Sequence, residues 1–305
     1  MKIDNANRFI WLGGRILKLQ DATINVLSPT VQFGANVFEG IRCYWNKNKR
    51  QLYAFRLAEH YARLKDSMKI FRMEDKYKVE EFRQGLFDVV KANDYREDIA
   101  VRQTVFIDGF GSWSSTGPVN MFIAPIPQSH NPKPGLKCCI SSWLRISDRN
   151  LSPKVKVGAN YINSRMAQIE AVANGYDSAI FMNEQGKIAE GPGSCIFIVR
   201  DGVLITPPLT ASILDSITRK TVIDLARNLL KLAVVERDID RTELYICEEA
   251  FLCGSAIEIM PILSVDGISL KAGEGSDVCK AIRETYLNVV HGEIDAYSKW
   301  LTPIY

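Results

Sequence analysis

Lys156 is the residue of this chain with the clearest chemical potential. It lies in Lys156-Val-Gly-Ala-Asn-Tyr161, with a valine on either side and a predicted helix directly after it. A lysine amine can attack a carbonyl carbon and form an imine. Because an isolated lysine is far more often a structural or surface residue, the assignment depends on other groups that fit the same chemistry.

Three further segments offer such groups. Glu190, between two predicted strands in Ile188-Ala-Glu-Gly-Pro-Gly193, could hold a protonated ring nitrogen with its carboxylate. Asp215-Ser-Ile-Thr-Arg219 begins a predicted helix, where backbone N–H groups and the Thr218 hydroxyl can bind a phosphate. Gly254-Ser255-Ala256 adds a second hydroxyl and two backbone donors. An amine, an acid and phosphate donors are what pyridoxal 5′-phosphate (PLP) requires.

The spacing of apolar residues predicts the elements that must position these groups. Leu57, Tyr61, Leu64, Met68 and Phe71 recur at intervals of three and four, which predicts an amphipathic helix. Further helices are predicted for 79–92, 160–174 and 217–232, and strands for 9–12, 41–45, 99–107, 119–126, 138–143, 178–182, 194–199 and 203–206. Helices and strands alternate in both halves, which indicates a mixed α/β or α+β protein.

A proline-rich segment predicts the boundary between two domains. Residues 125–135 contain four prolines, which a helix or a central strand would not tolerate. We therefore expect a smaller N-terminal α/β domain over residues 1–126, a linker over 127–135 and a larger C-terminal domain over 136–305. The C-terminal domain carries Lys156, Glu190 and the predicted phosphate-binding segments.

Composition excludes several classes of protein. A net charge of +3 without a long basic run argues against nucleic acid as a partner. No run of 18 apolar residues and no signal peptide is found, and the seven cysteines are odd in number without a Cys-x-x-Cys pair. We expect a cytoplasmic protein with free thiols and no membrane segment. Three scattered histidines predict no metal site. P-loop and nucleophile-elbow motifs are absent, and Gly191-Pro-Gly193 lacks the third glycine of a dinucleotide fingerprint.

The order of these segments resembles the class IV (fold-type IV) PLP enzymes, and among them the branched-chain amino-acid aminotransferases. Matching motifs span nearly the whole chain and include Val37-Phe-Glu-Gly-Ile-Arg42, Phe55-Arg56, Lys156 to Tyr161, Glu190-Gly191, Thr206-Pro-Pro208, Ile217-Thr-Arg219 and Ser264-Val-Asp-Gly267. The resemblance implies a two-domain fold of the D-amino-acid-aminotransferase type with PLP at the domain interface. It also implies a homodimer or larger homo-oligomer, because the loop matching Asp108–Thr116 reaches a neighbouring subunit in that family.

The resemblance also implies a role for each matched residue. Lys156 would form the Schiff base with PLP and act as the catalytic proton shuttle. The implied cofactor-binding residues are Arg56, Lys156, Tyr161, Glu190, Ile217, Thr218 and Ser255. The implied substrate-binding residues are Phe33, Phe38, Gly40, Arg102, Ser255 and Ala256. The implied reaction is a ping-pong transamination between an L-amino acid, branched-chain or similar, and a 2-oxo acid, in the family usually 2-oxoglutarate.

Several positions depart from the pattern of the branched-chain enzymes. Ala100 and Phe33 stand where tyrosines are common, Gln103 replaces a proline, and Ser194-Cys195 replaces an acidic or asparagine pair. We expect these changes to alter the side of the pocket that selects the substrate. The alternatives are an enzyme similar to aminodeoxychorismate lyase, a D-amino-acid aminotransferase, a PLP enzyme of a specialised biosynthetic pathway, and a non-catalytic binding protein with the same fold.

Overall fold

The computed structural model describes residues 8–131, 133–270 and 277–305, and the chain divides into two compact units. Unit 1 contains Met1–Ser129, Val155–Ala159 and Val289–Tyr305, and unit 2 contains His130–Lys154 and Asn160–Asn288. The change of unit after Ser129 falls inside the predicted linker. The predicted C-terminal domain differs from unit 2, however, because the short segment around Lys156 and the last residues of the chain group with unit 1.

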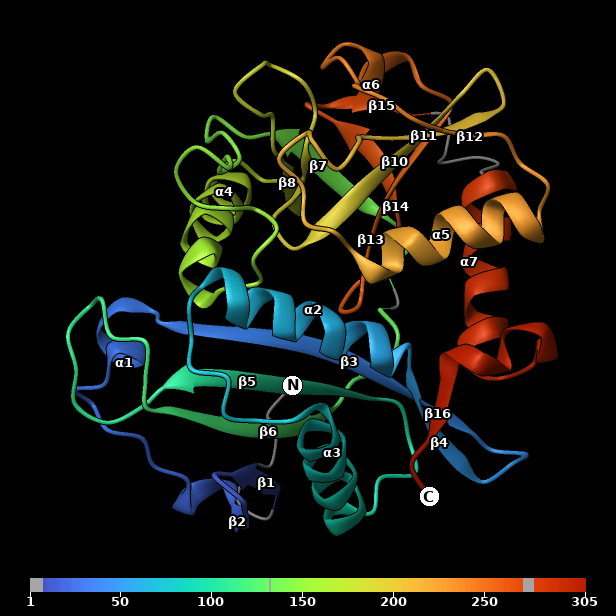
Figure 1. Ribbon diagram of the computed structural model, residues 1–305. Helices are drawn as coiled ribbons and strands as arrows, with labels where there is room; N and C mark the ends of the chain where they lie inside the picture. The colour runs from blue at the N-terminus through green and yellow to red at the C-terminus, as the bar shows by residue number, and fades with distance from the viewer. Residues whose placement is uncertain (1–7, 132, 271–276) are drawn as a thin grey trace. The chain divides into compact units, whose positions relative to one another are not determined.

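Unit 1 is built on a seven-stranded sheet in the order β16-β4-β3-β5-β6-β1-β2 (Figure 1). The strands are β1 (Phe9–Leu12), β2 (Arg15–Lys18), β3 (Asn36–Asn46), β4 (Gln51–Phe55), β5 (Ile99–Ile107), β6 (Val119–Pro127) and β16 (Leu301–Pro303). β3 pairs with β5 from Asn36 to Cys43, but with β4 only from Cys43 to Asn46. The other edge of β3 is therefore left uncovered by β4 over its first residues.

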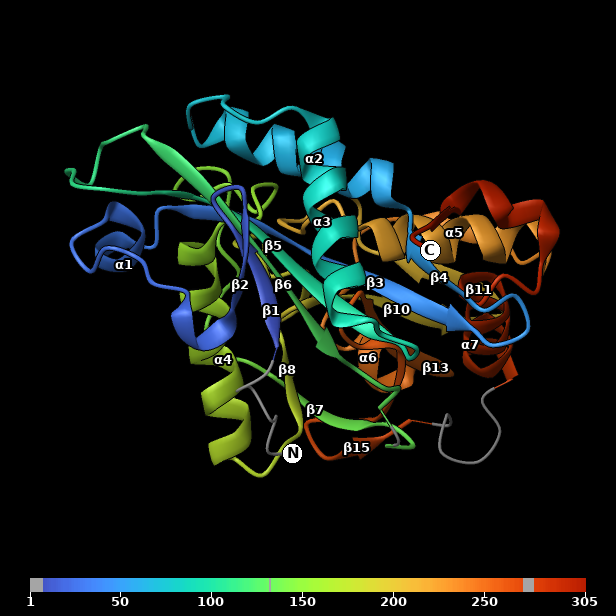
Figure 2. The ribbon, with the colours of Figure 1, turned by 90° about the horizontal axis from the view of Figure 1, so that it is seen from below.

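Alternating side chains divide the unit 1 sheet into two faces. Val37, Ile41 and Val101 face a core that also contains Leu64 and Leu86. These two leucines come from α2 (Leu57–Ile70) and α3 (Val79–Asn93). α2 lies along β3 (Figure 1), and α3 packs against β1 and β6 (Figure 2). We call this side of the sheet the core face and the opposite side the open face.

A buried charge cluster on the core face joins β3 to α2. Glu39 is completely buried and accepts hydrogen bonds from His60 Nδ1 and from Arg63 Nε and Nη2, each at 2.7 Å. Burial alone would raise the pKa of Glu39, but the Arg63 guanidinium and the His60 hydrogen bond lower it to about 2. Burial lowers the pKa of His60, so the neutral ring donates its Nδ1 proton. The forked contact of Arg63 fixes α2 against the middle of β3.

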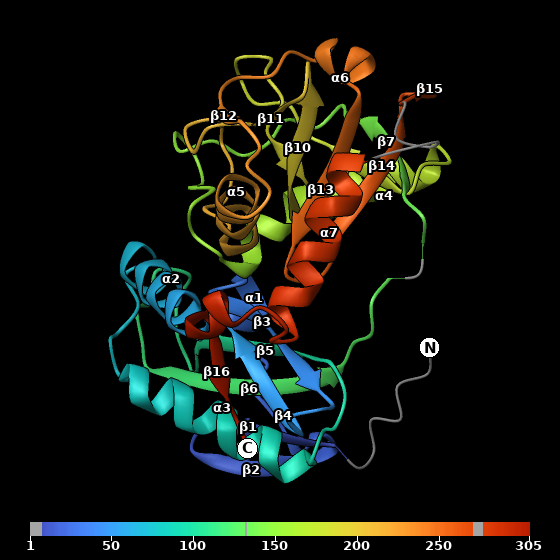
Figure 3. The same ribbon diagram turned by 90° about the vertical axis from the view of Figure 1, so that its right-hand side faces the viewer.

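Unit 2 is built on a nine-stranded sheet whose main path is β12-β11-β10-β13-β14-β7-β8, with β9 beside β10 and β15 beside β14. The strands are β7 (Leu136–Ile140), β8 (Ser178–Ile180), β9 (Glu190–Gly191), β10 (Ser194–Arg200), β11 (Val203–Thr206), β12 (Val234–Glu236), β13 (Glu249–Gly254), β14 (Glu258–Val265) and β15 (Ile268–Ser269). The helices are α4 (Tyr161–Ala173), α5 (Ile217–Asn228), α6 (Glu243–Ile246) and α7 (Asp277–Val290) (Figures 1 and 3).

Small side chains allow α4 to pack closely on the unit 2 sheet. Ala167 and Ala171 of α4 share a buried cluster with Ala179 of β8 and Cys139 of β7. Deeper in the unit, Phe197 and Phe251 of the paired strands β10 and β13 stack with ring centroids 5.1 Å apart. This packing fixes β10, which pairs with the strand of Glu190, and β13, which directly precedes Ser255.

Each predicted element has an observed counterpart, but several bounds differ: the strand predicted for 41–45 belongs to the longer β3, and the strand predicted for 138–143 ends at Ile140. The strand predicted for 99–107 is β5 with the same bounds. Pro125 lies inside β6, in agreement with the strand predicted for 119–126, whereas Pro127, expected in the linker, is the last residue of β6. Because β1 pairs only with Phe122 and Ile123, this end of β6 is an edge that tolerates proline. The helix expected to reach residue 232 ends at Asn228, and Lys231 has a left-handed backbone (φ 57°).

The cysteines agree with the sequence prediction. All seven are free and buried, and burial raises the pKa of thiols such as Cys43 and Cys138. Among the helices of the described residues, none has the length and apolar character needed to cross a membrane.

The Glu39 cluster generates the first prediction. Glu39→Gln should lower the free energy of unfolding at pH 7 by about 3 kcal/mol, because it leaves the Arg63 guanidinium without its anion. The folded pKa of about 2 lies below the ordinary 4.5, so this stabilisation is complete above pH 4.5 and is lost as the pH falls towards 2. Urea unfolding between pH 7 and pH 3 measures it. Glu80→Gln, on the exposed side of α3, is the matched control. If the difference in unfolding free energy between the wild type and Glu39→Gln does not shrink as the pH falls, the stabilising role of the ionised Glu39 is wrong.

Candidate active site

Lys156 lies beside the part of β3 that β4 leaves uncovered. The Phe38 N–H donates to the Lys156 carbonyl oxygen at 2.9 Å, and Val157 forms an antiparallel bridge with Val37. Val157 is buried and faces the core side with Val37, so the neighbouring Lys156 side chain points to the open face. Its Nζ atom lies 4.9 Å from the centre of the Phe38 ring.

The other main-chain group of Lys156 is held by α2. The Lys156 N–H donates to Ser67 Oγ at 3.2 Å. Ser67 is buried in the same helix that the Glu39 cluster attaches to β3. Both backbone groups of the lysine are therefore fixed by neighbouring elements, while its amine is carried on a flexible four-carbon chain.

The open face of β3 and β5 brings together three of the predicted substrate residues, Phe38, Gly40 and Arg102. Arg102 pairs directly opposite Gly40, and its Cζ atom lies 3.9 Å from the centre of the Phe38 ring. A Cβ atom added at Gly40 would meet no heavy atom within 4 Å, so the glycine leaves open space beside the guanidinium. Phe38, Gly40, Arg102 and Lys156 thus form one cationic and aromatic surface.

Arg56 begins α2 in an unusual backbone conformation. It has left-handed dihedral angles (φ 49°, ψ 43°), which are uncommon for a residue other than glycine or asparagine. Its Nε donates to Glu59 at 2.9 Å, and its backbone N–H donates to the Trp300 carbonyl at 2.7 Å. A strained residue that neighbours hold so firmly is typical of a functional site.

Glu190 in unit 2 is a buried carboxylate with a defined set of donors. It is 4% exposed and accepts from Arg145 Nε at 2.8 Å and from the Leu214 N–H at 3.2 Å. The Cys195 thiol, one of the departures noted in the sequence, lies 3.8 Å from Glu190 Oε2. The Arg145 ion pair compensates the burial of this charge and fixes the direction of the carboxylate.

The two predicted phosphate segments lie close to Glu190 within unit 2. Cys195 pairs with both Glu190 and Cys253, and the turn containing Ser255 and Ala256 directly follows β13. A Cβ atom at Gly254 would lie 3.2 Å from the Gly193 carbonyl oxygen, so this glycine allows the two turns to approach.

The start of α5 is the second of these segments. α5 begins at Ile217, only three residues after the Leu214 N–H that binds Glu190. Its N-cap Ser216 accepts from the Arg219 N–H at 3.2 Å, which confirms the predicted start of the helix. The buried Thr218 lies in its first turn. The backbone N–H groups of such a turn are not used within the helix and can bind a phosphate.

Two predicted residues lie outside these groups of contacts. Phe33 ends the short helix α1 (Pro29–Phe33) and is 53% exposed, and no described contact joins it to Phe38 or Arg102. Tyr161 opens α4 and is half-buried. Their roles remain predictions.

Two departures expected to affect the substrate side do not lie there, because Cys195 contacts Glu190 and Gln103 lies on the core face. Gln103 is completely buried, and its Nε2 contacts the Phe82 carbonyl oxygen at 3.2 Å on the core face. The expectation for Gln103 was wrong, because successive residues of a strand face opposite sides and Arg102 occupies the open face. Ala100 does lie on the open face, directly opposite Arg42.

Sequence reasoning missed three residues that the structure places in these groups. Arg42 is buried on the open face and lies over the Tyr44 ring at 5.2 Å. Its alternation with Phe38 and Gly40 in the same motif could have identified it. Ser67 and Arg145 had no such signal, because each acts through a contact between segments far apart in the chain.

Comparison with known proteins agrees with this geometry. The model of the amino-transferase class IV family matches residues 36–265. The chain is 35% identical over 301 residues to a probable branched-chain-amino-acid aminotransferase of Aquifex aeolicus, with 97% of each chain covered. The PLP form of the branched-chain amino acid aminotransferase from Thermobaculum terrenum gives a TM-score of 0.94 at 43% identity, covering 99% of this chain and 100% of that one. The T.th. branched-chain enzyme complexed with N-(5′-phosphopyridoxyl)-L-glutamate gives 0.92 at 33% identity, covering 98% and 99%.

The buried ion pair of Glu190 generates the second prediction. Arg145→Met should lower the free energy of unfolding of the cofactor-free protein by about 3 kcal/mol, because it leaves the Glu190 carboxylate buried without its cation. Arg227→Met is the matched control, since Arg227 is half-exposed and lies 4.0 Å from Glu236. We expect that variant to change stability by less than about 0.5 kcal/mol in the same urea titration. Equal losses in the two variants would refute the importance of the buried pair.

Proposed function

The chain belongs to the class IV aminotransferases, and from this premise we propose that it transfers the amino group of a branched-chain L-amino acid to a 2-oxo acid with PLP as cofactor. The observation that carries the proposal is the placement of Lys156. Its main chain is hydrogen-bonded to β3 and α2, and its amine lies over Phe38 on the same surface as Arg102. A lysine that must first hold the cofactor and then move a proton needs a fixed backbone and a mobile amine.

The donor set fits PLP in its chemistry. Lys156 would hold the cofactor through its amine, and the buried Glu190 carboxylate would accept the proton of the pyridine nitrogen. Arg56, the backbone of Ile217 and the hydroxyls of Thr218 and Ser255 would bind the phosphate, with Tyr161 at the phenolic oxygen. PLP, when bound, withdraws electrons from the substrate Cα and so allows its proton to leave.

Lys156 would then act as the base of the reaction. With the cofactor bound, its Nζ atom would accept the proton that leaves the substrate Cα and would hold that proton until it is returned. The Phe38 and Ser67 hydrogen bonds keep the lysine Cα in place during both transfers. Positioned proton transfer of this kind typically accelerates a reaction by about 10²- to 10⁴-fold.

The open face suits a substrate with one apolar end and one carboxylate. Phe38 and the space above Gly40 would receive the side chain, and Arg102 would bind the carboxylate with help from the backbone of Ser255 and Ala256. Arg42 adds a second guanidinium to this face two residues from Gly40. Two guanidinium groups suit an acceptor with two carboxylates, which supports 2-oxoglutarate. The T.th. relative in complex with a phosphopyridoxyl-glutamate agrees with this choice.

We further propose that the protein is a cytoplasmic homodimer or larger homo-oligomer. The loop at Asp108–Thr116 exposes 80% of Phe110 and 76% of Trp113. Large aromatic side chains exposed together are typical of a surface that another chain covers. The seven free thiols support a reducing compartment.

The role of Lys156 generates the third prediction. Lys156→Ala should reduce turnover of leucine with 2-oxoglutarate by at least about 10³-fold, because it removes both the covalent anchor and the base. The rate of 4-methyl-2-oxopentanoate formation measures it. Lys154→Ala, at an exposed lysine two residues away, is the control and should keep the wild-type rate. Borohydride reduction followed by peptide mapping should place the pyridoxyl group on Lys156. A label on another lysine refutes the assignment.

The substrate class generates the fourth prediction. With 2-oxoglutarate as acceptor, L-leucine, L-isoleucine and L-valine should react, and their D-enantiomers should not. L-alanine should have a kcat/KM about 10- to 100-fold lower than that of L-leucine, because its side chain fills less of the space beside Phe38. Initial rates over this panel decide the matter. If the three branched-chain donors are inert while another donor reacts, the branched-chain assignment is wrong.

A further inference from the structure

The last residues of the chain hold Arg56 from two directions. The Trp300 carbonyl accepts the Arg56 N–H at 2.7 Å, and the Trp300 ring lies under the guanidinium, 4.6 Å from Cζ to the ring centroid. On the other side, Glu59 pairs with Arg56 Nε at 2.9 Å. The backbone contact supports the left-handed conformation of Arg56, and the ring and the carboxylate together restrict its guanidinium plane.

Trp300 is itself held firmly within unit 1. Its ring lies 4.5 Å from that of Tyr297 and meets the Phe55 ring edge to face at 6.0 Å. The next residue, Leu301, begins β16 and pairs with Phe55 of β4. Since Phe55 directly precedes Arg56, the strand pairing that places Trp300 also places the start of α2.

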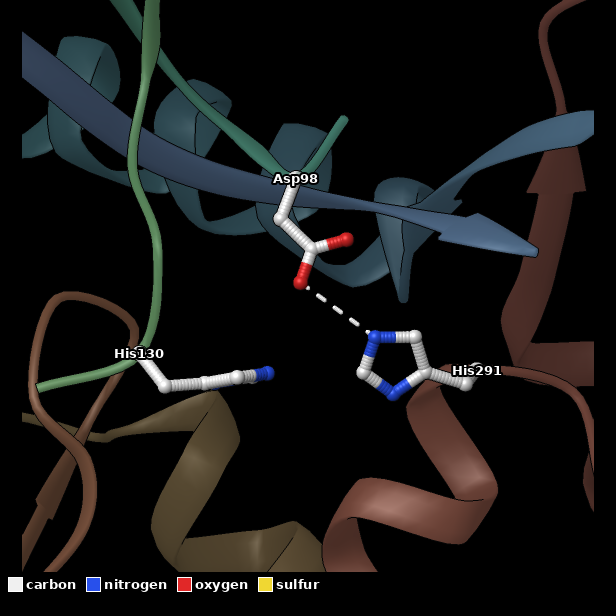
Figure 4. Close-up of side chains that lie close together, drawn as sticks. All are labelled: Asp98, His130 and His291. Carbon is white, nitrogen blue, oxygen red and sulfur yellow. Dashed lines mark hydrogen bonds and ion pairs between the residues drawn. The ribbon is translucent and has the colours of Figure 1, made fainter. Parts of the chain in front are cut away.

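Further contacts fix the C-terminal tail, which we define as Val289–Tyr305, to the unit 1 sheet. His291 Nε2 pairs with Asp98 Oδ2 at 3.2 Å (Figure 4), and the His291 carbonyl oxygen accepts from Asn46 Nδ2 at 2.6 Å. At the other end of the tail, the Ile304 N–H donates to the Leu52 carbonyl at 3.0 Å. The tail is thus anchored on both sides of Trp300.

We propose that Trp300 is a positioning residue that orients Arg56 towards the phosphate of the cofactor, so that the C-terminal tail sets cofactor affinity. This inference rests on the proposed function, in which Arg56 binds that phosphate. A long arginine side chain loses conformational freedom when it binds a ligand, and an aromatic ring that already restricts it reduces this loss. Stacking on tryptophan leaves the guanidinium edge, where the N–H groups lie, able to face an anion.

The test is equilibrium binding of PLP and of pyridoxal, which lacks the phosphate, to the full-length protein after removal of its cofactor. Trp300→Leu should raise the Kd for PLP by about tenfold and change that for pyridoxal by less than about twofold. Trp300→Phe keeps an aromatic face and should recover most of the affinity. Tyr305→Leu is the matched control, because it removes a similar stacking contact with Arg96 (4.3 Å) from the same tail, and both Kd values should stay unchanged.

A double-mutant cycle separates failure of this inference from failure of the proposed function. In an Arg56→Ala background, Trp300→Leu should weaken PLP binding by less than about twofold, because the residue that Trp300 positions is gone. Equal losses for PLP and pyridoxal, or full additivity with Arg56→Ala, would show a general structural role and overturn the inference. If Arg56→Ala alone leaves PLP affinity unchanged, the phosphate role assigned to Arg56 fails, and the inference fails with it. Trp300→Phe keeps the test decisive if Trp300→Leu does not fold.

Discussion

The pairing of the Lys156 segment with the uncovered edge of β3 is the contact on which the rest of the candidate site depends. β4 pairs only with the last residues of β3, so Phe38 has a backbone N–H available for the Lys156 carbonyl. Strand alternation then decides the direction of every neighbouring side chain. With Val157 turned to the core, Lys156 must point to the face that carries Phe38 and Arg102. One hydrogen bond and the alternation of side chains along a strand thus determine where the Lys156 amine lies.

Two buried carboxylates are stabilised in the same way but occupy different surroundings. Glu39 and Glu190 are each almost fully buried, and each is bound by an arginine at 2.7–2.8 Å. Burial of an unpaired carboxylate would cost several kcal/mol, so both positions require their cations. The partners of Glu39 all lie on α2, where the cluster fixes the helix that also binds the Lys156 N–H. Glu190 lies close to the start of α5 through the Leu214 N–H, and close to the Ser255 turn through the pairing of Cys195 with Cys253.

The sequence was sufficient for what depends on local spacing and insufficient for what depends on distant pairing. Apolar periodicity predicted α2 and β5 nearly to the residue, and the capping pattern predicted where α5 begins. Gln103 was misjudged although strand alternation from Arg102 already places it on the opposite face, where its side chain contacts the Phe82 carbonyl oxygen. Trp300 contacts Arg56 although more than 240 positions separate them in the chain, and no local pattern predicts such a contact.

The residues of β3 that stabilise the fold lie on one face of the strand, and the residues beside Lys156 lie on the other. On the core face, Val37, Glu39 and Ile41 contact the core cluster or α2, so a change at any of them acts through folding. On the open face, Phe38 and Gly40 line the surface beside Lys156, so a change there alters the surroundings of the lysine amine. Because successive residues alternate between these roles, a shift of register by one residue would exchange them all. The long pairing of β3 with β5 and the buried Glu39 cluster both oppose such a shift, so the contacts of the core face preserve the geometry of the open face.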